Sequence, residues 1–147
     1  MGDARGDKGH LGIDTNVLVS FLDAGHPDHK DAERLADANA ATNPTLIHEA
    51  YHTLVYAQKW GRDQAMDVLT DYVDMDTTLF LNQTKGITRT GLSIGREYGL
   101  GGRDSLILAS FLSNGIGKMV TFDKSLLALD KISMDGRVMH IVLPLDI

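Results

Sequence analysis

The sequence predicts an α/β protein with a parallel sheet, and three observations carry that prediction. Short apolar runs recur along the chain, and the runs at 10–14 and 118–123 each end on an acidic residue. Segments with helical spacing of apolar residues separate these runs. The chain has 147 residues, of which 43% are apolar, and this is enough for one buried core. Strands that alternate with helices favour a parallel sheet with right-handed crossover connections.

The first half of the chain opens on a strand that ends at Asp14, with Gly12 interrupting its apolar run. Pro27 and Asp28 mark the start of a helix, because proline is favoured in the first helical turn. Asp14 taken alone could equally cap the helix that follows it. The other elements expected here are helices at 17–22, 28–38, 48–59 and 62–75, a loop at 39–44 and a brief strand at 45–47.

The second half of the chain continues the alternation of strands and helices. Three glycines within 84–98 lower the helix propensity of that segment without removing its pattern. Residues 99–102 form a glycine-rich loop, and Asn114-Gly115 ends the apolar helix after it. The elements expected here are helices at 84–98, 104–113 and 124–128 and strands at 78–81, 118–122 and 138–143.

Charge is distributed unevenly along the chain. The net charge of −6 by itself argues against a nucleic-acid partner. Residues 1–84 carry 14 acidic and 6 basic residues, whereas residues 85–147 carry 6 acidic and 8 basic residues. The second half can therefore present a basic surface, formed by Arg89, Arg96, Arg103, Lys118 and Lys124. Within it, Arg103 stands beside Asp104 and could bind a phosphate or form a surface ion pair.

The ends of the chain and its cysteine content bear on where the protein acts. Residues 1–9 are polar, glycine-rich and without periodicity, so we expect a disordered or cloning-derived tail and a single domain over 10–147. The sequence has no secretory signal and no apolar run of about 18 residues that could span a membrane. It contains no cysteine, which excludes disulfides and fits a cytoplasmic protein.

Four acidic residues fall at equivalent places in this arrangement. Asp14 and Asp123 end predicted strands, and Glu49 and Asp104 lie in the first turns of predicted helices. In a parallel sheet these positions share one edge, where ligands bind. Clustered carboxylates repel one another, and Mg²⁺ or Mn²⁺ relieves the repulsion through all-oxygen ligation. Such ions assist displacement at phosphorus, so the residues by themselves favour a phosphodiesterase site.

The segments around these acids are Ile13 to Leu18, the helix containing Glu49, Gly102 to Ala109, and Thr121-Phe122-Asp123. In order and spacing they resemble the PIN-domain nucleases, over residues 10–147. The resemblance implies a three-layer fold with a central parallel five-stranded sheet flanked by helices. It also implies a Mg²⁺- or Mn²⁺-dependent ribonuclease. The residues that match the family's metal ligands are Asp14, Glu49, Asp104 and Asp123, and those that match its positions for orienting the acids or a water are Asn16 and Thr121.

Within that family the chain is most similar to the VapC-type toxins of toxin–antitoxin pairs. This implies an RNA substrate, cleavage that leaves 5′-phosphate and 3′-hydroxyl ends, a homodimer, and inhibition by a small antitoxin that inserts a basic or aromatic segment near the acids. Two alternatives stay open within this resemblance. One is a housekeeping RNA-processing nuclease, and the other is a module that binds RNA or an antitoxin but has lost turnover.

A different motif overlaps one of the four acids. Residues 48–52 read His-Glu-x-x-His, in which two histidines one helical turn apart bind zinc and the glutamate acts as general base of a peptidase. The third histidine of the longer metzincin motif does not follow, and Glu97 is the only later glutamate. A zinc peptidase through His48, Glu49 and His52 would leave the three aspartates without a role, so it is the weaker alternative.

Overall fold

The computed structural model describes residues 9–147, so the tail predicted at residues 1–9 lies outside the described residues except for Gly9. The strands are β1 (His10–Ile13), β2 (Asn39–Thr42), β3 (Thr78–Phe80), β4 (Lys118–Val120), β5 (Lys131–Met134) and β6 (Arg137–Val142). The α-helices are α2 (Thr15–Leu22), α3 (His29–Ala32), α4 (Pro44–Tyr56), α5 (Arg62–Asp74), α6 (Lys85–Tyr98), α7 (Gly102–Ser113) and α8 (Lys124–Leu127). Two short 3₁₀ helices are η1 (Glu33–Leu35) and η2 (Pro144–Asp146), so the helix predicted at 28–38 is divided into α3 and η1.

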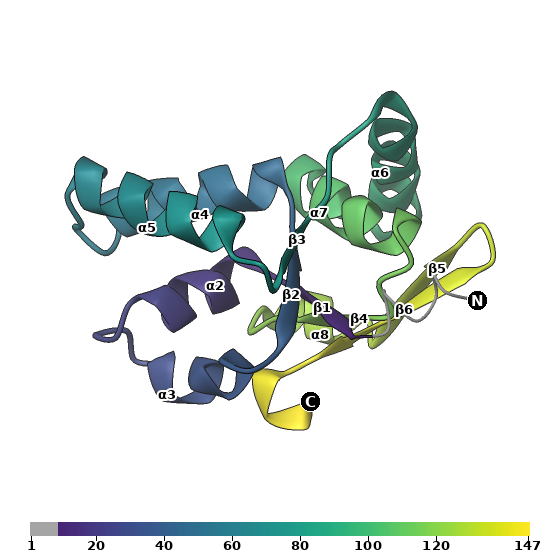
Figure 1. The fold of residues 1–147 in the computed structure, drawn as a ribbon. Helices are drawn as coiled ribbons and strands as arrows, with labels where there is room; N and C mark the ends of the chain where they lie inside the picture. The colour runs from purple at the N-terminus through teal and green to yellow at the C-terminus, as the bar shows by residue number, and fades with distance from the viewer. Residues whose placement is uncertain (1–8) are drawn as a thin grey trace.

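The six strands form one sheet in the order β3-β2-β1-β4-β6-β5. Every pairing is parallel except that of β5 with β6. The chain runs from β1 outward to β3 and then crosses back to β4 on the other side of β1. Right-handed crossovers therefore place α2 to α5 and α6 to α7 on opposite faces of the sheet. In Figure 1 the first group lies at the left and the second at the upper right, and α4 meets α7 between them. The predicted α/β class with a helix-flanked, mostly parallel sheet is confirmed.

The sheet has six strands rather than the expected five, because β5 and β6 form a hairpin. Asp135 and Gly136 connect them, with φ angles of 54° and 80°. Asp-Gly is a strong signal for a two-residue hairpin turn, since both of its residues tolerate positive φ. The expected strand at 138–143 is half of this hairpin, and the Asp-Gly signal could have identified the other half.

The second strand lies earlier in the chain than expected. Residues 39–44 were expected to be a loop, but Asn39–Thr42 forms β2, and the strand expected at 45–47 is the first turn of α4. β2 is made of small residues and is held by pairing with both β1 and β3. Asn43 caps α4 by accepting the Leu46 N–H at 3.0 Å. Glu49 therefore lies in the second turn of α4 rather than the first, beyond the reach of the helix N-terminal charge.

Gly12 explains how α7 packs against the central strand. A Cβ at this position would lie 2.6–2.9 Å from three ring atoms of Phe111 on α7. Phe111 is completely buried. The interruption of the apolar run in β1 is thus what allows the ring to lie directly against the strand. Gly91 plays a similar part between α6 and α7, where a Cβ would lie 3.3 Å from the Cα of Leu106.

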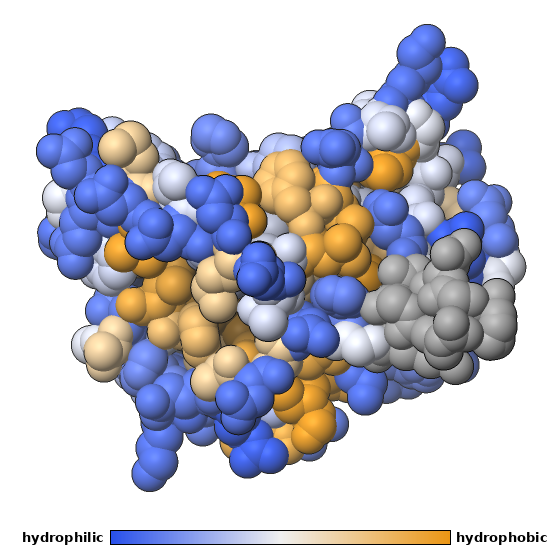
Figure 2. All heavy atoms as spheres, in the orientation of Figure 1, coloured by the Kyte–Doolittle hydropathy of each residue, from blue (hydrophilic) through white to orange (hydrophobic). Residues whose placement is uncertain are grey.

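Apolar side chains reach the surface on one face of the molecule. Figure 2 shows them in a hollow beside β3, between α3 and α5, and in a second area on the other side of β3, toward α7. The residues that line this hollow include Phe21, Leu35, Tyr72 and Met75. Across residues 9–147, none of the helices combines the length and the apolar character needed to cross a membrane.

Candidate active site

The carboxyl edge of the parallel strands holds an open pocket of about 360 Å³ that takes in all four predicted acids. Asp14 directly follows β1, Asp123 precedes α8, Asp104 lies in the first turn of α7 and Glu49 in the second turn of α4. The full lining is Asp14, Thr15, Asn16, Glu49, His52, Thr53, Arg103, Asp104 and Asp123. Of the six residues singled out in the sequence, the structure thus brings five to one pocket, and Thr121 is buried against Asp14.

Asp14 is the most buried of the four acids, with 7% of its surface exposed. Its Oδ1 accepts the Thr15 N–H at 2.9 Å, and its Oδ2 accepts the Thr121 hydroxyl at 2.7 Å. Burial raises the pKa of Asp14 to about 6; the two hydrogen bonds oppose this rise, and the charges of Asp104 and Glu49 add to it. Asp14 is also the N-cap of α2. Capping the helix and facing the pocket are therefore compatible roles of one carboxylate.

Thr121 and Asn16 connect Asp14 to the segment that carries Asp123. The Thr121 Oγ1 that donates to Asp14 also accepts the Asp123 N–H at 3.0 Å. Asn16 Oδ1 accepts the Phe122 N–H at 3.4 Å. These contacts tie the beginning of α2 to the end of β4, so the relative position of the two aspartates depends on them.

The other two aspartates differ in their electrostatics. Burial raises the pKa of Asp104, as do the charges of Asp123 and Glu49, while Arg103 lowers it. The pKa of Asp123 is lowered, chiefly by the Ser125 hydroxyl, which donates to Oδ1 at 2.6 Å. Ionisation is thus opposed at Asp14 and Asp104 and favoured at Asp123, and the acids influence one another through their charges.

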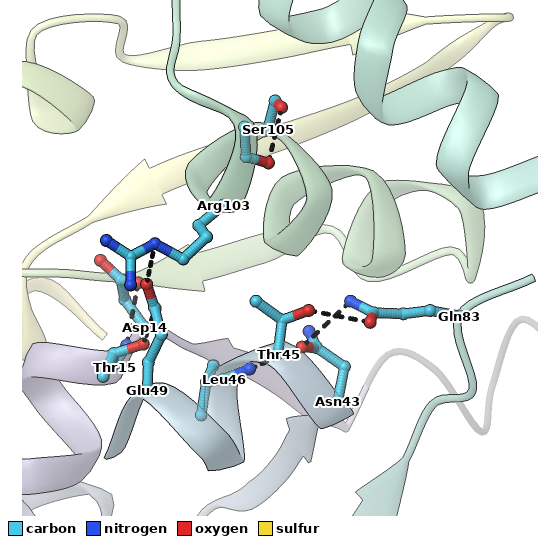
Figure 3. A network of polar contacts seen from close by, with 10 residues as sticks. Asp14, Thr15, Asn43, Thr45, Leu46, Glu49, Gln83, Arg103 and Ser105 are labelled. Atoms are coloured by element: carbon cyan, nitrogen blue, oxygen red, sulfur yellow. Dashed lines mark hydrogen bonds and ion pairs between the residues drawn. The ribbon is translucent and has the colours of Figure 1, made fainter. Parts of the chain in front are cut away.

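Glu49 is held from two sides. Its Oε1 accepts the Thr15 hydroxyl at 2.7 Å, and its Oε2 forms an ion pair with Arg103 Nε at 3.2 Å. Figure 3 shows Arg103 reaching from α7 toward Glu49, Thr15 and Asp14. Thr15 was not singled out in the sequence, although a hydroxyl next to a candidate acid is a signal that could have identified it. The partner of Arg103 could not be identified in this way, because it lies on a distant helix.

A second group of polar contacts fixes the start of α4, the helix that carries Glu49. Thr45 Oγ1 donates to Gln83 Oε1 at 2.9 Å, and Gln83 Nε2 donates to Asn43 Oδ1 at 3.3 Å. Both contacts are drawn in Figure 3. Gln83 lies in the segment between β3 and α6, so this network anchors the N-terminus of α4 to a part of the chain far away in sequence.

The pocket suits a magnesium-type ion in the chemistry of its donors. Among residues 9–147, no three His, Asp or Glu side chains are arranged to hold one metal ion directly. Mg²⁺ does not require that arrangement, because it usually keeps several waters and binds one or two carboxylates. A cation would also relieve the repulsion that disfavours ionised Asp14 and Asp104. The all-oxygen set therefore fits Mg²⁺ or Mn²⁺.

The zinc-peptidase motif does not fit its metal in the same way. Catalytic zinc takes three direct protein ligands, and in the described part of the chain no third ligand joins His48 and His52. Both histidines are exposed on α4, and the ring of His52 lies 4.8 Å from that of Tyr56. Glu49, which would be the general base, is instead engaged with Thr15 and Arg103.

The fold and the pocket define an α/β protein with an acidic site at the carboxyl edge of a mostly parallel sheet. The family model of the PIN domain matches residues 12–132, and the chain belongs to the PIN-domain family. The resemblance found in the sequence is thereby confirmed. No curated protein matches the chain by sequence.

Three solved structures illustrate the likeness in fold. VapC20 of Mycobacterium tuberculosis, a toxin that cleaves the sarcin–ricin loop, has a TM-score of 0.69 at 18% identity, covering 84% of this chain and 98% of its own. A toxin–antitoxin complex from Klebsiella pneumoniae has a TM-score of 0.63 at 18% identity, covering 91% and 97%. FitAcB from Neisseria gonorrhoeae has a TM-score of 0.57 at 15% identity, covering 93% and 99%.

Proposed function

We propose that this chain is a Mg²⁺- or Mn²⁺-dependent endoribonuclease that hydrolyses RNA phosphodiester bonds. The observation that carries the proposal is the meeting of four acids from four separate elements in one pocket. Membership of the PIN-domain family, a family of nucleases, supports the class of reaction. The proposed metal ligands are Asp14, Glu49, Asp104 and Asp123, and the proposed positioning residues are Asn16 and Thr121.

The residues of the chain would supply positioning rather than covalent chemistry. A bound ion lowers the pKa of a water and stabilises charge that develops on the phosphate. Two hydrogen bonds fix the Asp14 carboxylate, Ser125 fixes Asp123, and Thr15 fixes one oxygen of Glu49. Ligands fixed in advance need little reorganisation when a cation and a phosphodiester enter the pocket.

The direct test is cleavage of total RNA in Mg²⁺ or Mn²⁺, with the cut sites mapped and the ends characterised. Asp14→Asn and Asp104→Asn should each abolish cleavage while leaving the circular dichroism spectrum unchanged. Asp67→Asn is the matched control, because Asp67 is exposed on α5 and does not line the pocket. Full activity in both pocket variants would refute the proposal, and an intact wild type that binds Mn²⁺ but cuts no RNA would favour the binding module.

The peptidase alternative has its own readout. Metal analysis of purified protein should give no stoichiometric zinc, and His48→Ala should retain RNA cleavage, because His48 does not line the acid pocket. One zinc per chain together with peptide hydrolysis that His48→Ala removes would reverse this conclusion.

We further propose that the nuclease is the toxin of a toxin–antitoxin pair and acts in the cytoplasm. The solved structures with a similar fold include toxins and toxin–antitoxin complexes, which supports this assignment over a housekeeping RNA-processing role.

The proposed partners are a small antitoxin and a second copy of the chain. Induced expression should stop growth, and co-expression of the proposed antitoxin should restore growth; growth unaffected by the active nuclease would favour the housekeeping role. The mass in solution, measured by light scattering, should be that of a dimer.

A further inference from the structure

Arg103 occupies an unusual position for a cation near the candidate site. Among the described residues that line the acid pocket, it is the only arginine or lysine, and it faces four acids. Its side chain is 76% exposed, whereas that of its partner Glu49 is 20% exposed. The contact joins α7 to α4 across the pocket mouth. In this arrangement the guanidinium offsets part of the negative charge at Glu49 and Asp104.

The ion pair of Arg103 with Glu49 is of a kind that exchanges easily. It joins Arg103 Nε to Glu49 Oε2 at 3.2 Å. Exposed ion pairs contribute about 0–1 kcal/mol, because solvent screens them and the side chains lose freedom. Glu49 Oε1 keeps its hydrogen bond from Thr15 independently of Arg103. Arg103 could therefore leave without displacing Glu49 from the pocket.

There is also room for Arg103 to move. It lines both the acid pocket and a neighbouring hollow of about 260 Å³, formed with Thr45, His48, Glu49 and His52. Gly101 and Gly102 precede it at the beginning of α7, and apart from their own chain neighbours and the helix backbone nothing lies within 4 Å of the positions that their Cβ atoms would take. The Arg103 side chain thus lies between the acid pocket and the neighbouring hollow, close to the loosely packed N-terminus of α7.

We propose that Arg103 is an exchangeable counter-ion that pairs with Glu49 while the pocket lacks a divalent cation and moves to a phosphate of the RNA when a cation binds. This inference rests on the proposed function of the pocket. With a cation held at Glu49, the Arg103 guanidinium would lose its partner and would be repelled by the added positive charge. A phosphodiester attracts the guanidinium, and the fork of N–H donors matches phosphate oxygens. Arg103 is thus a competitor of the metal and a ligand of the substrate.

The two roles predict effects of opposite sign for one substitution. Arg103→Ala removes the competitor, so the affinity for Mn²⁺ measured by calorimetry without RNA should rise about two- to fivefold, the worth of an exposed ion pair. The same variant should bind RNA about tenfold more weakly, since it lacks a charge-assisted contact to phosphate. If Arg103 had a merely structural role, its substitution would weaken both the Mn²⁺ affinity and the RNA affinity, or would change neither.

The RNA measurement uses a fluorescein-labelled 12-nucleotide RNA in Ca²⁺, with the RNA shown to be intact on a gel. The slope of log K against log salt should fall by about 0.7 in Arg103→Ala, the loss of one phosphate contact. Arg103→Lys keeps the charge but not the fork, so its RNA affinity should be intermediate. Arg34→Ala is the matched control, since Arg34 is exposed on η1, outside both the acid pocket and the basic surface of the second half, and both affinities should stay at the wild-type value.

The outcomes separate this inference from the proposed function. Unchanged or weaker Mn²⁺ binding in Arg103→Ala would overturn the competition, and unchanged RNA binding would overturn the phosphate contact. Either result leaves the nuclease proposal standing if the wild type cleaves RNA. Failure of the wild type to bind Mn²⁺ at all would instead remove the proposed function together with this inference.

Discussion

Asp14→Asn should stabilise the protein in the absence of metal, even though it should abolish RNA cleavage. Asp14 is 7% exposed, and burial raises its pKa from 3.8 to about 6. Each pKa unit corresponds to about 1.4 kcal/mol, so ionised Asp14 opposes folding by about 3 kcal/mol. Asparagine has nearly the same shape and no charge, and its Oδ1 can still accept the Thr15 N–H. We expect a gain of about 2–3 kcal/mol in the free energy of unfolding at pH 7.5.

The gain should depend on pH in a defined direction. Unfolded Asp14 releases its proton near pH 4, whereas folded Asp14 releases it near pH 6. Between these values the folded state binds more protons than the unfolded state, so the stability of the wild type falls as the pH rises. The gain in the free energy of unfolding from Asp14→Asn is therefore absent below about pH 4, grows between about pH 4 and 6, and is constant above about pH 7.

The assay is urea unfolding of wild type and variant in EDTA at pH 4 and pH 7.5. Their free energies of unfolding are compared on the condition that the m-values of the two proteins agree. Asp123→Asn is the control of opposite sign, because the pKa of Asp123 is lowered by its hydrogen bond from Ser125, and this variant should gain nothing at pH 7.5. Added Mg²⁺ should stabilise the wild type but not Asp14→Asn, by ligand linkage. A variant no more stable than wild type at pH 7.5, or one equally stabilised at both pH values, would refute the reasoning.

Three further predictions test the surroundings of the site. Gly12→Ala should destabilise the protein by about 1–3 kcal/mol in urea unfolding, because its Cβ would meet the Phe111 ring, and Phe111→Leu in the same chain should recover part of the loss; equal losses with and without Phe111 would contradict the clash. Thr121→Val should move the acidic limb of the pH–activity profile upward, because Asp14 loses a hydrogen bond that lowers its pKa; an unmoved limb would show that Thr121 does not act through Asp14. Removal of divalent ions with EDTA should abolish RNA cleavage, and added Mn²⁺ should restore it; cleavage that persists in EDTA would argue against a metal-dependent site.

Local sequence signals were sufficient where an element carries its own pattern. The apolar periodicity of α5 and α7 and the acids at strand ends depend on residues close in sequence, so the fold class and the candidate acids can be predicted from the sequence. The position of β2 was not accessible, because Asn39–Thr42 is small and weakly patterned and owes its strand conformation to pairing with β1 and β3. The start of α4 moved with it, which placed Glu49 a turn deeper into the helix.

Local patterns along the chain are enough to predict an α/β protein of the PIN type with acids at one edge of a parallel sheet. Alternating periodicities and the residue types at strand ends are local properties, and they suffice for that conclusion. The burial, hydrogen bonds and neighbouring charges of each acid, by contrast, are set by tertiary contacts. The burial of Asp14, the hydroxyl of Thr121 against it and the ion pair of Arg103 with Glu49 join residues far apart in the chain. Desolvation and Coulomb interactions depend on distance in space, and for that reason the sequence pattern does not contain them.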